Sequence, residues 1–233
     1  MPHDPYKSLY IHIPFCKSRC NYCDFHTNAV PQSSKWIEEY SEFVVSEIRR
    51  FSKEGELSQI ESVYIGGGTP THIGTKYLSS ILYAIGLSMH LTDDVEFTVE
   101  GNPESIDERL IADIWALGAN RLSIGVQSFD DGLLKTLGRA HNSQDAENAI
   151  KAAQTRFENI SIDLMCGLPG QTLEQFDQSI YKALSLGVKH ISVYPLTIES
   201  GTKFEEMLLA ERLHILDEDT QADMLEMAAD RFS

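Results

Sequence analysis

The chain has 233 residues, of which 42% are hydrophobic and 23% are charged, the proportions of an ordinary globular protein. Its formal net charge is −16, and lysine and arginine form no cluster, which argues against nucleic acid as a partner. The longest apolar run, Ser80 to Leu91, is much shorter than the roughly 20 residues of a membrane-spanning helix. The first residues lack the apolar core of a signal peptide, so we expect a cytoplasmic protein without a membrane segment.

Strand-like and helix-like segments alternate along the chain. Six apolar runs are typical of buried strands: Ser8–Ile13, Ser62–Ile65, Val95–Val99, Arg121–Ile124, Ile160–Leu164 and His190–Tyr194. Helical spacing of apolar residues follows each run: Trp36–Phe51, Tyr77–His90, Leu110–Leu117, Ala146–Phe157, Leu173–Leu186 and Thr220–Phe232. This repeat predicts an α/β fold with parallel strands and outer helices. Because a closed barrel needs eight strands, we expect an open sheet or a partial (β/α)6 TIM-like barrel.

The chemically unusual residues follow the predicted strands. Three cysteines follow the first strand, a glycine run follows the second, and Glu100 ends the third. Gln127 follows the fourth strand and Asp163 lies at the end of the fifth. Since the carboxyl ends of parallel strands share one edge of the sheet, we expect these residues to form one site there.

Three of the four cysteines stand close together, in the C-x3-C-x2-C spacing of Cys16, Cys20 and Cys23. Thiolates are ligands for zinc and for iron–sulfur clusters, and a reducing compartment disfavours disulfides, so the spacing predicts a metal site. A four-iron cluster on three cysteines would leave one iron free to bind another group. The alternative is a structural zinc site with His26 as the fourth ligand.

A glycine run, Gly66 to Gly68, has no Cβ atoms and would let a ligand approach the main chain closely. A glycine-rich turn alone is weak support, since this one lacks the lysine and the serine or threonine of a phosphate-binding loop. Side chains that could hold a ribose, an amino group and a carboxylate are those of Glu100, Gln127, Arg139 and Asp163. Asp163 is the most informative, because it interrupts an apolar strand, where an unpaired carboxylate is costly.

Five segments in this order resemble a known family: YIHIPFCKSRCNYCDF, GGGTPT, VEGNPESID, RLSIGVQSFDDGLLKTLGRAH and IDLMCGLPGQT. They are similar to radical S-adenosylmethionine (SAM) proteins of the oxygen-independent coproporphyrinogen III oxidase family, across nearly the whole chain. Full-length members usually carry a further C-terminal domain. The resemblance therefore implies that residues 1–233 are the radical SAM core domain and that the C-terminal domain is missing.

The resemblance implies two cofactors and a set of residues for them. A [4Fe–4S] cluster would be held by Cys16, Cys20 and Cys23, with SAM chelating the remaining iron. The positions that match the family's SAM contacts are Tyr10, Tyr22, Gly67, Gly68, Thr69, Glu100, Gln127, Arg139 and Asp163. A reductant such as flavodoxin or ferredoxin is an implied partner. No residue is assigned a catalytic role.

One residue bears on the branch of this family. Members that decarboxylate coproporphyrinogen III typically carry a further cysteine two positions after the third cluster ligand, where this chain has Phe25. The chain therefore resembles the HemW-type branch, regarded as haem chaperones that pass haem to respiratory proteins. The alternative is an oxygen-independent coproporphyrinogen III oxidase, so enzymatic activity stays open, with haem or a porphyrin as the expected ligand in either case.

Overall fold

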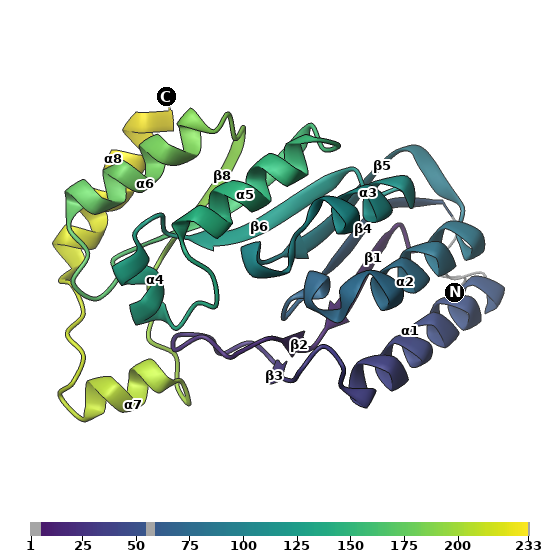
Figure 1. Ribbon diagram of the computed structural model, residues 1–233, viewed down its shortest axis with the longest axis horizontal. Coiled ribbons are helices and arrows are strands. Elements are labelled where there is room, and N and C mark those ends of the chain that lie inside the picture. The colour runs from purple at the N-terminus through teal and green to yellow at the C-terminus, as the bar shows by residue number, and fades with distance from the viewer. Residues whose placement is uncertain (1–5, 55–58, 233) are drawn as a thin grey trace, which may run out of the picture.

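The computed structural model describes residues 6–54 and 59–232 and contains one six-stranded parallel sheet (Figure 1). Its strands pair in chain order: β1 (Ser8–Ile13), β4 (Ile60–Gly67), β5 (Leu91–Gly101), β6 (Arg121–Gln127), β7 (Asn159–Cys166) and β8 (His190–Pro195). β1 and β8 are the two edges, so the barrel is open between them. The prediction of a partial barrel with six parallel strands is confirmed. β4 runs on to Gly67, so two of the three glycines belong to the strand itself.

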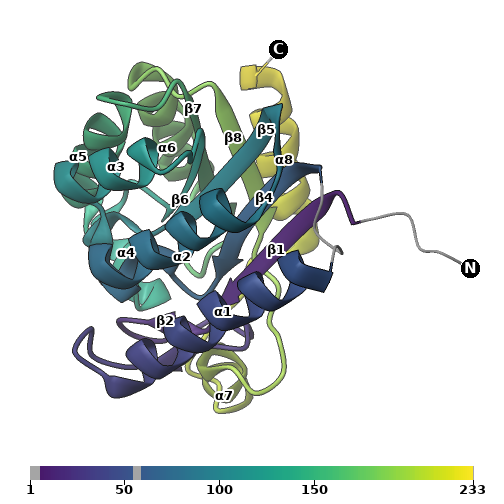
Figure 2. The same cartoon turned by 90° about the vertical axis from the view of Figure 1, so that its right-hand side faces the viewer.

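Helices cover the outer face of this sheet (Figure 2). They are α1 (Lys35–Glu54), α2 (Gly74–Ser88), α3 (Glu108–Ala116), α5 (Ser143–Gln154), α6 (Leu173–Ser185) and α8 (Glu218–Phe232). α8 packs against α6 and the last two strands. These six helices agree with the predicted helical segments apart from a few residues at their ends. Within the described ranges, no helix has both the length and the apolar character needed to span a membrane.

The two faces of the sheet differ in chemistry because successive strand residues point to opposite sides. In β7, Ile160, Ile162 and Leu164 are buried against the outer helices, in a large apolar cluster that we call the main core. Ser161 and Asp163, between them, point to the inner face. The helices therefore stabilise the outer face, and the inner face is free to carry polar groups.

Several short elements have no counterpart among the predicted segments. They are α4 (Asp131–Leu137), α7 (Lys203–Leu209), the 3-10 helices η1 (Pro70–Ile73) and η2 (Pro103–Ser105), and a small parallel pair, β2 (Phe15–Cys16) with β3 (Asn28–Ala29). Two turns of helix are too short to produce a clear helical period. Their ends are set locally instead: Asp130 accepts a hydrogen bond from the amide of Leu133 at the start of α4, and Gly138, with φ of 73°, ends it.

Candidate functional site

An open pocket lies at the carboxyl ends of the strands. Eleven of the twelve predicted site residues line it: Cys16, Cys20, Tyr22, Cys23, Gly67, Gly68, Thr69, Glu100, Gln127, Arg139 and Asp163. They come from the loops and ends of five strands, which the parallel topology brings to one edge.

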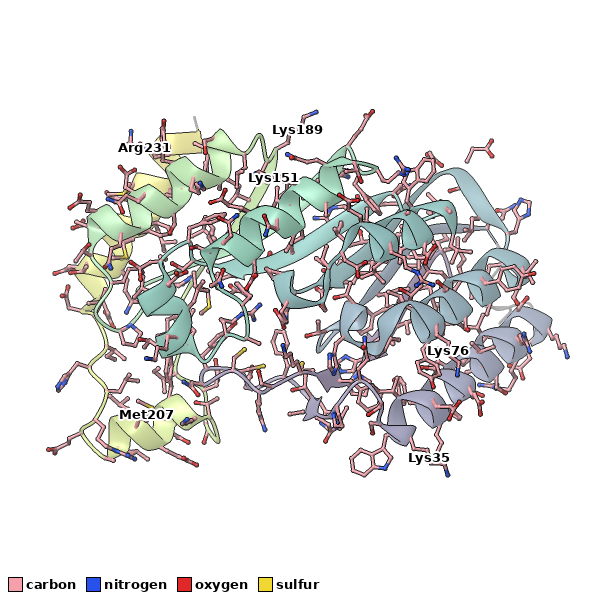
Figure 3. All side chains as sticks on the ribbon, viewed as in Figure 1. Lys35, Lys76, Lys151, Lys189, Met207 and Arg231 are labelled. Atoms are coloured by element: carbon pink, nitrogen blue, oxygen red, sulfur yellow. The ribbon has the colours of Figure 1, made fainter. Side chains whose placement is uncertain are left out.

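The loop from Phe15 to Ala29, which we call the cysteine loop, is closed at its base by the β2–β3 pair. Its middle is held by Asn21, whose amide donates to the carbonyl of Leu137 (2.9 Å) and whose side-chain Nδ2 donates to the carbonyl of Thr136 (2.8 Å). The carbonyl of Asn21 in turn accepts from the amide of Phe204 (2.8 Å). α4 and α7, with Met207 marked in Figure 3, therefore fix the loop that carries the cysteines.

Two of the thiols accept hydrogen bonds from other parts of the pocket. The Oγ1 atom of Thr69 lies 3.4 Å from Sγ of Cys16, and Nη1 of Arg139 lies 3.6 Å from Sγ of Cys20. Burial is the main reason why the pKa values of Cys16 and Cys23 are raised above the usual thiol value. A bound metal reverses this effect, because it stabilises the thiolate directly.

A four-ligand zinc site is not formed by these residues. His26 is exposed, lies outside the residues that line the pocket, and its carbonyl accepts a hydrogen bond from Nε2 of His12 (3.0 Å). Among residues 6–54 and 59–232, no three histidine, cysteine or acidic side chains stand close enough to hold a single metal ion. The arrangement thus differs from the compact tetrahedral geometry of structural zinc.

The buried guanidinium of Arg139 joins the strand ends across the pocket. Its Nη2 atom donates to Oδ1 of Asn102 (2.7 Å) and to the carbonyl of Gly125 (2.6 Å), and Nη1 lies 3.4 Å from the hydroxyl of Tyr22. Asn102 continues the network, because its Nδ2 atom donates to Oγ1 of Thr69 (2.9 Å). The Nε atom of Arg139 is buried and has no hydrogen-bond partner among the described residues. A buried donor of this kind can bind a ligand acceptor.

Glycine is required where the backbone forms the pocket wall. Gly67 has φ of 114°, and a Cβ atom there would lie 2.7 Å from the ring of His12. A Cβ atom on Gly68 would lie 2.9 Å from Sγ of Cys16. The glycines therefore let the backbone of this wall pack closely against His12 and Cys16.

Two carboxyl groups face the inner side of the pocket. Glu100 accepts hydrogen bonds from the hydroxyl of Tyr64 (2.5 Å) and from the amide of Gly67 (3.1 Å). Burial, followed by the nearby charge of Glu100, raises the pKa of Asp163 to about 6. The proton of Asp163 is therefore held far more tightly than that of an ordinary aspartate.

Tyr10 is the predicted site residue that the structure does not bring to the pocket. It lies on β1, is 57% exposed, and its hydroxyl donates to Nδ1 of His12 (3.0 Å). Conversely, Asn102 and Tyr64 belong to the site network without having been among the predicted contacts. Tyr64 had a sequence signal, since it precedes Gly66 by one strand period and so faces the same side.

Comparison with known proteins supports the same family. The sequence model of the radical SAM superfamily matches residues 10–183. The heme chaperone HemW of Bacillus subtilis is 40% identical over 95% of this chain and 58% of its own length. HemW of Escherichia coli is 36% identical over 86% of this chain and 53% of its own length. The chain thus spans a little over half the length of these relatives.

A solved structure gives the same result for the fold. Coproporphyrinogen III oxidase (HemN) from Escherichia coli, described as a radical SAM enzyme, superposes with a TM-score of 0.83 at 24% identity, over 96% of this chain and 51% of that one. The similarity to HemW proteins agrees with the resemblance read from the motifs, and the family implies a [4Fe–4S] cluster and SAM. The chain belongs to the radical SAM superfamily.

Proposed function

We propose that this chain is the cluster- and SAM-binding core of a HemW-like haem chaperone. The observation that carries the proposal is the gathering of three cysteines, the glycine wall and the Arg139 network in one pocket of a chain whose curated relatives are named heme chaperones. The proposal extends to the domain: residues 1–233 are the radical SAM core, and haem delivery requires the rest of the relatives' length.

The donor set fits a [4Fe–4S] cluster. Cys16, Cys20 and Cys23 would be its ligands, since they are half-buried thiols on a loop that is tied down at its base and its middle. In such a cluster each thiolate binds a separate iron, so the three thiols need not converge on one ion. When bound, the reduced cluster supplies the electron for radical chemistry on SAM.

The rest of the pocket fits SAM. The unpartnered Nε–H of Arg139 would donate to its carboxylate, and Gly67 and Gly68, which line the pocket, would present main chain to the ligand. Glu100 and Asp163 would accept from the ribose hydroxyls, and Gln127, Thr69 and Tyr22 complete the proposed contacts. Tyr10 does not line the pocket, and it would act from beside Tyr64, whose ring centroid lies 6.1 Å from its own.

Phe25 favours the chaperone over the decarboxylase. It lines the pocket and is 62% exposed, at the position where decarboxylating members typically carry a cysteine. The proposed partners are haem, a haem-accepting respiratory protein and a reductant such as flavodoxin or ferredoxin. The second candidate, an oxygen-independent coproporphyrinogen III oxidase, is favoured only by the structural similarity to HemN, which at 24% identity supports the fold alone.

Metal analysis after anaerobic reconstitution tests the cluster. We expect about four irons and matching sulfide per chain, and loss of both in Cys20→Ala. Cys166→Ala is the matched control, because Cys166 is a free cysteine buried in the main core, outside the pocket. One zinc per chain, or a full cluster in Cys20→Ala, would contradict the proposal.

Haem titration and a decarboxylation assay separate the two candidate functions. A full-length version is expected to change its Soret absorption when haem is added and to form no protoporphyrinogen from coproporphyrinogen III with SAM and reductant. Formation of the decarboxylated product would favour the oxidase instead.

A further inference from the structure

A buried histidine behind the pocket has both ring nitrogens against acceptors. The side chain of His141 is 0% exposed. Its Nε2 atom lies 3.1 Å from the carbonyl of Val126, and its Nδ1 atom lies 3.3 Å from Oε2 of Glu104. Neither Nδ1 nor Oε2 has a hydrogen-bond partner among the described residues, so their 3.3 Å contact is an ion pair if the ring is protonated.

The contacts of His141 require one more proton than a neutral imidazole and an ionised Glu104 carry together. A carbonyl oxygen only accepts, so Nε2 of His141 must carry a hydrogen. A neutral ring would then present the lone pair of Nδ1 to the carboxylate of Glu104, and two buried acceptors would face each other, which is costly. A proton on Nδ1 removes this conflict, because a positively charged ring then faces the carboxylate at 3.3 Å.

Three charged groups besides the imidazole lie in or near the pair formed by His141 and Glu104. Glu104 faces the ring from η2, Arg139 lies on the same connection two residues earlier, and Asp131 acts on the ring from α4. Burial opposes ionisation of Glu104, but the hydrogen bond with His141 and the charge of Arg139 outweigh it, so the pKa of Glu104 lies below its usual value. Glu104 is thus the carboxylate of the pair.

On one side, His141 holds the bulge that ends β6. The register between β6 and β7 shifts between Gly125 and Gln127, so Val126 is the extra residue. Its carbonyl accepts from His141 and from the amide of Ser128 (2.9 Å). The next residue, Gln127, has φ of 66°, a left-handed backbone that a non-glycine residue adopts only when its surroundings enforce it.

On the other side, the pair holds the segment that carries Asn102. Glu104 lies in η2, two residues after Asn102, whose side chain bonds both Arg139 and Thr69. The pair of His141 and Glu104, which we call the clamp, therefore connects the β6 bulge to the loop after β5 from behind the pocket. Both connected segments present side chains to the proposed SAM site.

We propose that His141 is a positioning residue, which as an imidazolium paired with Glu104 clamps the β6 bulge to η2 and thereby places Gln127 and Asn102–Arg139 for SAM. The proposal rests on the proposed function for its consequence, SAM binding. Its structural content, the doubly protonated ring, can be tested whether or not SAM binds.

Nitrogen NMR of histidine-labelled protein tests the protonation state. In the wild type we expect both ring nitrogens of His141 to carry protons at neutral pH. Glu104→Gln should convert the ring to the neutral form, because the amide can donate to Nδ1 and no negative charge remains to hold the second proton. The ring-nitrogen signals of His72 provide an internal reference in the same spectrum, since His72 is also buried and its Nε2 atom bonds the carbonyl of Val30 (2.8 Å).

SAM affinity of the cluster-loaded protein tests the positioning. We expect His141→Gln to weaken SAM binding about tenfold with unchanged iron content, the size of effect typical of residues that orient ligand-binding groups. Glutamine carries both amide hydrogens on one nitrogen, so it cannot replace the two separate ring nitrogens that face the Val126 carbonyl and the Glu104 carboxylate. The double variant His141→Gln with Glu104→Gln should recover most of the affinity, because one amide can then donate to the other.

The control variant is His72→Gln, which should keep the wild-type SAM affinity. A neutral His141 ring in the wild type, wild-type affinity in His141→Gln, or equal losses in the single and double variants would each overturn the clamp. Failure of the wild type to bind SAM would instead count against the proposed function, and the NMR result would then decide on the clamp. If His141→Gln does not fold, Glu104→Ala replaces it, with the same expected tenfold loss.

Discussion

The two sides of the sheet are stabilised in different ways. On the outer side, residues from every strand and from all six covering helices form the main core, in which Phe97, Phe176 and many others are fully buried. On the site side, a much smaller apolar cluster lies beside the cysteine loop, formed by Leu133, Leu137, Met165, Leu168, Leu196, Phe204 and Leu213. Tyr22, within the cysteine loop, packs against this second cluster.

The difference separates the fold from the site. The main core depends on apolar area alone, so it tolerates changes in the site. The cysteine loop depends on a few hydrogen bonds and on a cluster assembled from α4, α7 and loops. Such a small unit can open without unfolding the whole domain, so the site is expected to be the less stable of the two regions.

The largest effect is expected in the main core. Phe97→Ala removes a fully buried ring from β5 and should lower the free energy of unfolding by about 4 kcal/mol, through lost burial and the cavity left behind. Urea unfolding of the variant measures this loss. Tyr83→Ala on α2, where the ring is exposed, is the control and should leave stability nearly unchanged. A similar loss in both variants would remove the distinction between core and surface.

A smaller and more local effect is expected for the second cluster. Phe204→Ala should cost about 3 kcal/mol at most, because the residues around it can open without the main core. Hydrogen exchange should show faster exchange at the amides of Asn21 and Phe204, which bond across the cysteine loop. Unchanged exchange at Asn21, with a loss of stability equal to that of Phe97→Ala, would show that the two clusters unfold as one.

The titration of Asp163 makes the stability contributed by the site side depend on pH, which allows it to be tested. Its pKa is raised from 3.8 to about 6, so the folded state favours the neutral form, and its contribution to stability falls as the pH rises through this interval. Asp163→Asn removes that loss and should raise the free energy of unfolding well above pH 6 by about 3 kcal/mol, with little effect near pH 4. The same variant should bind SAM more weakly. Equal stabilisation at both pH values would contradict the raised pKa.

The smallest effect is expected at Asn21. Asn21→Ala removes the hydrogen bond to the carbonyl of Thr136 and should cost about 1 kcal/mol, while the reconstituted protein should lose iron faster than the wild type. Asn148→Ala is the matched control, since Asn148 is an asparagine on the exposed face of α5, far in sequence from the cysteine loop. Iron loss at the wild-type rate in Asn21→Ala would show that the bonds at this residue do not stabilise the cluster site.

The sequence by itself determined the repeating architecture and the place of the site. Apolar runs and helical spacing identify all six strands of the parallel sheet and the six long helices, because burial on one or both faces imposes a period that is visible locally. The C-x3-C-x2-C spacing and the glycine run lie at strand ends, so parallel topology alone brings them to one edge.

Only the tertiary structure decided how the site is held. The bonds from Arg139 to Asn102, from Asn21 to Thr136 and from His141 to Glu104 join residues far apart in the chain. α4 and α7 are too short to carry a period, and Tyr10 does not line the pocket although its motif is in place. Such contacts depend on distance and direction between elements, which no local pattern of residues encodes.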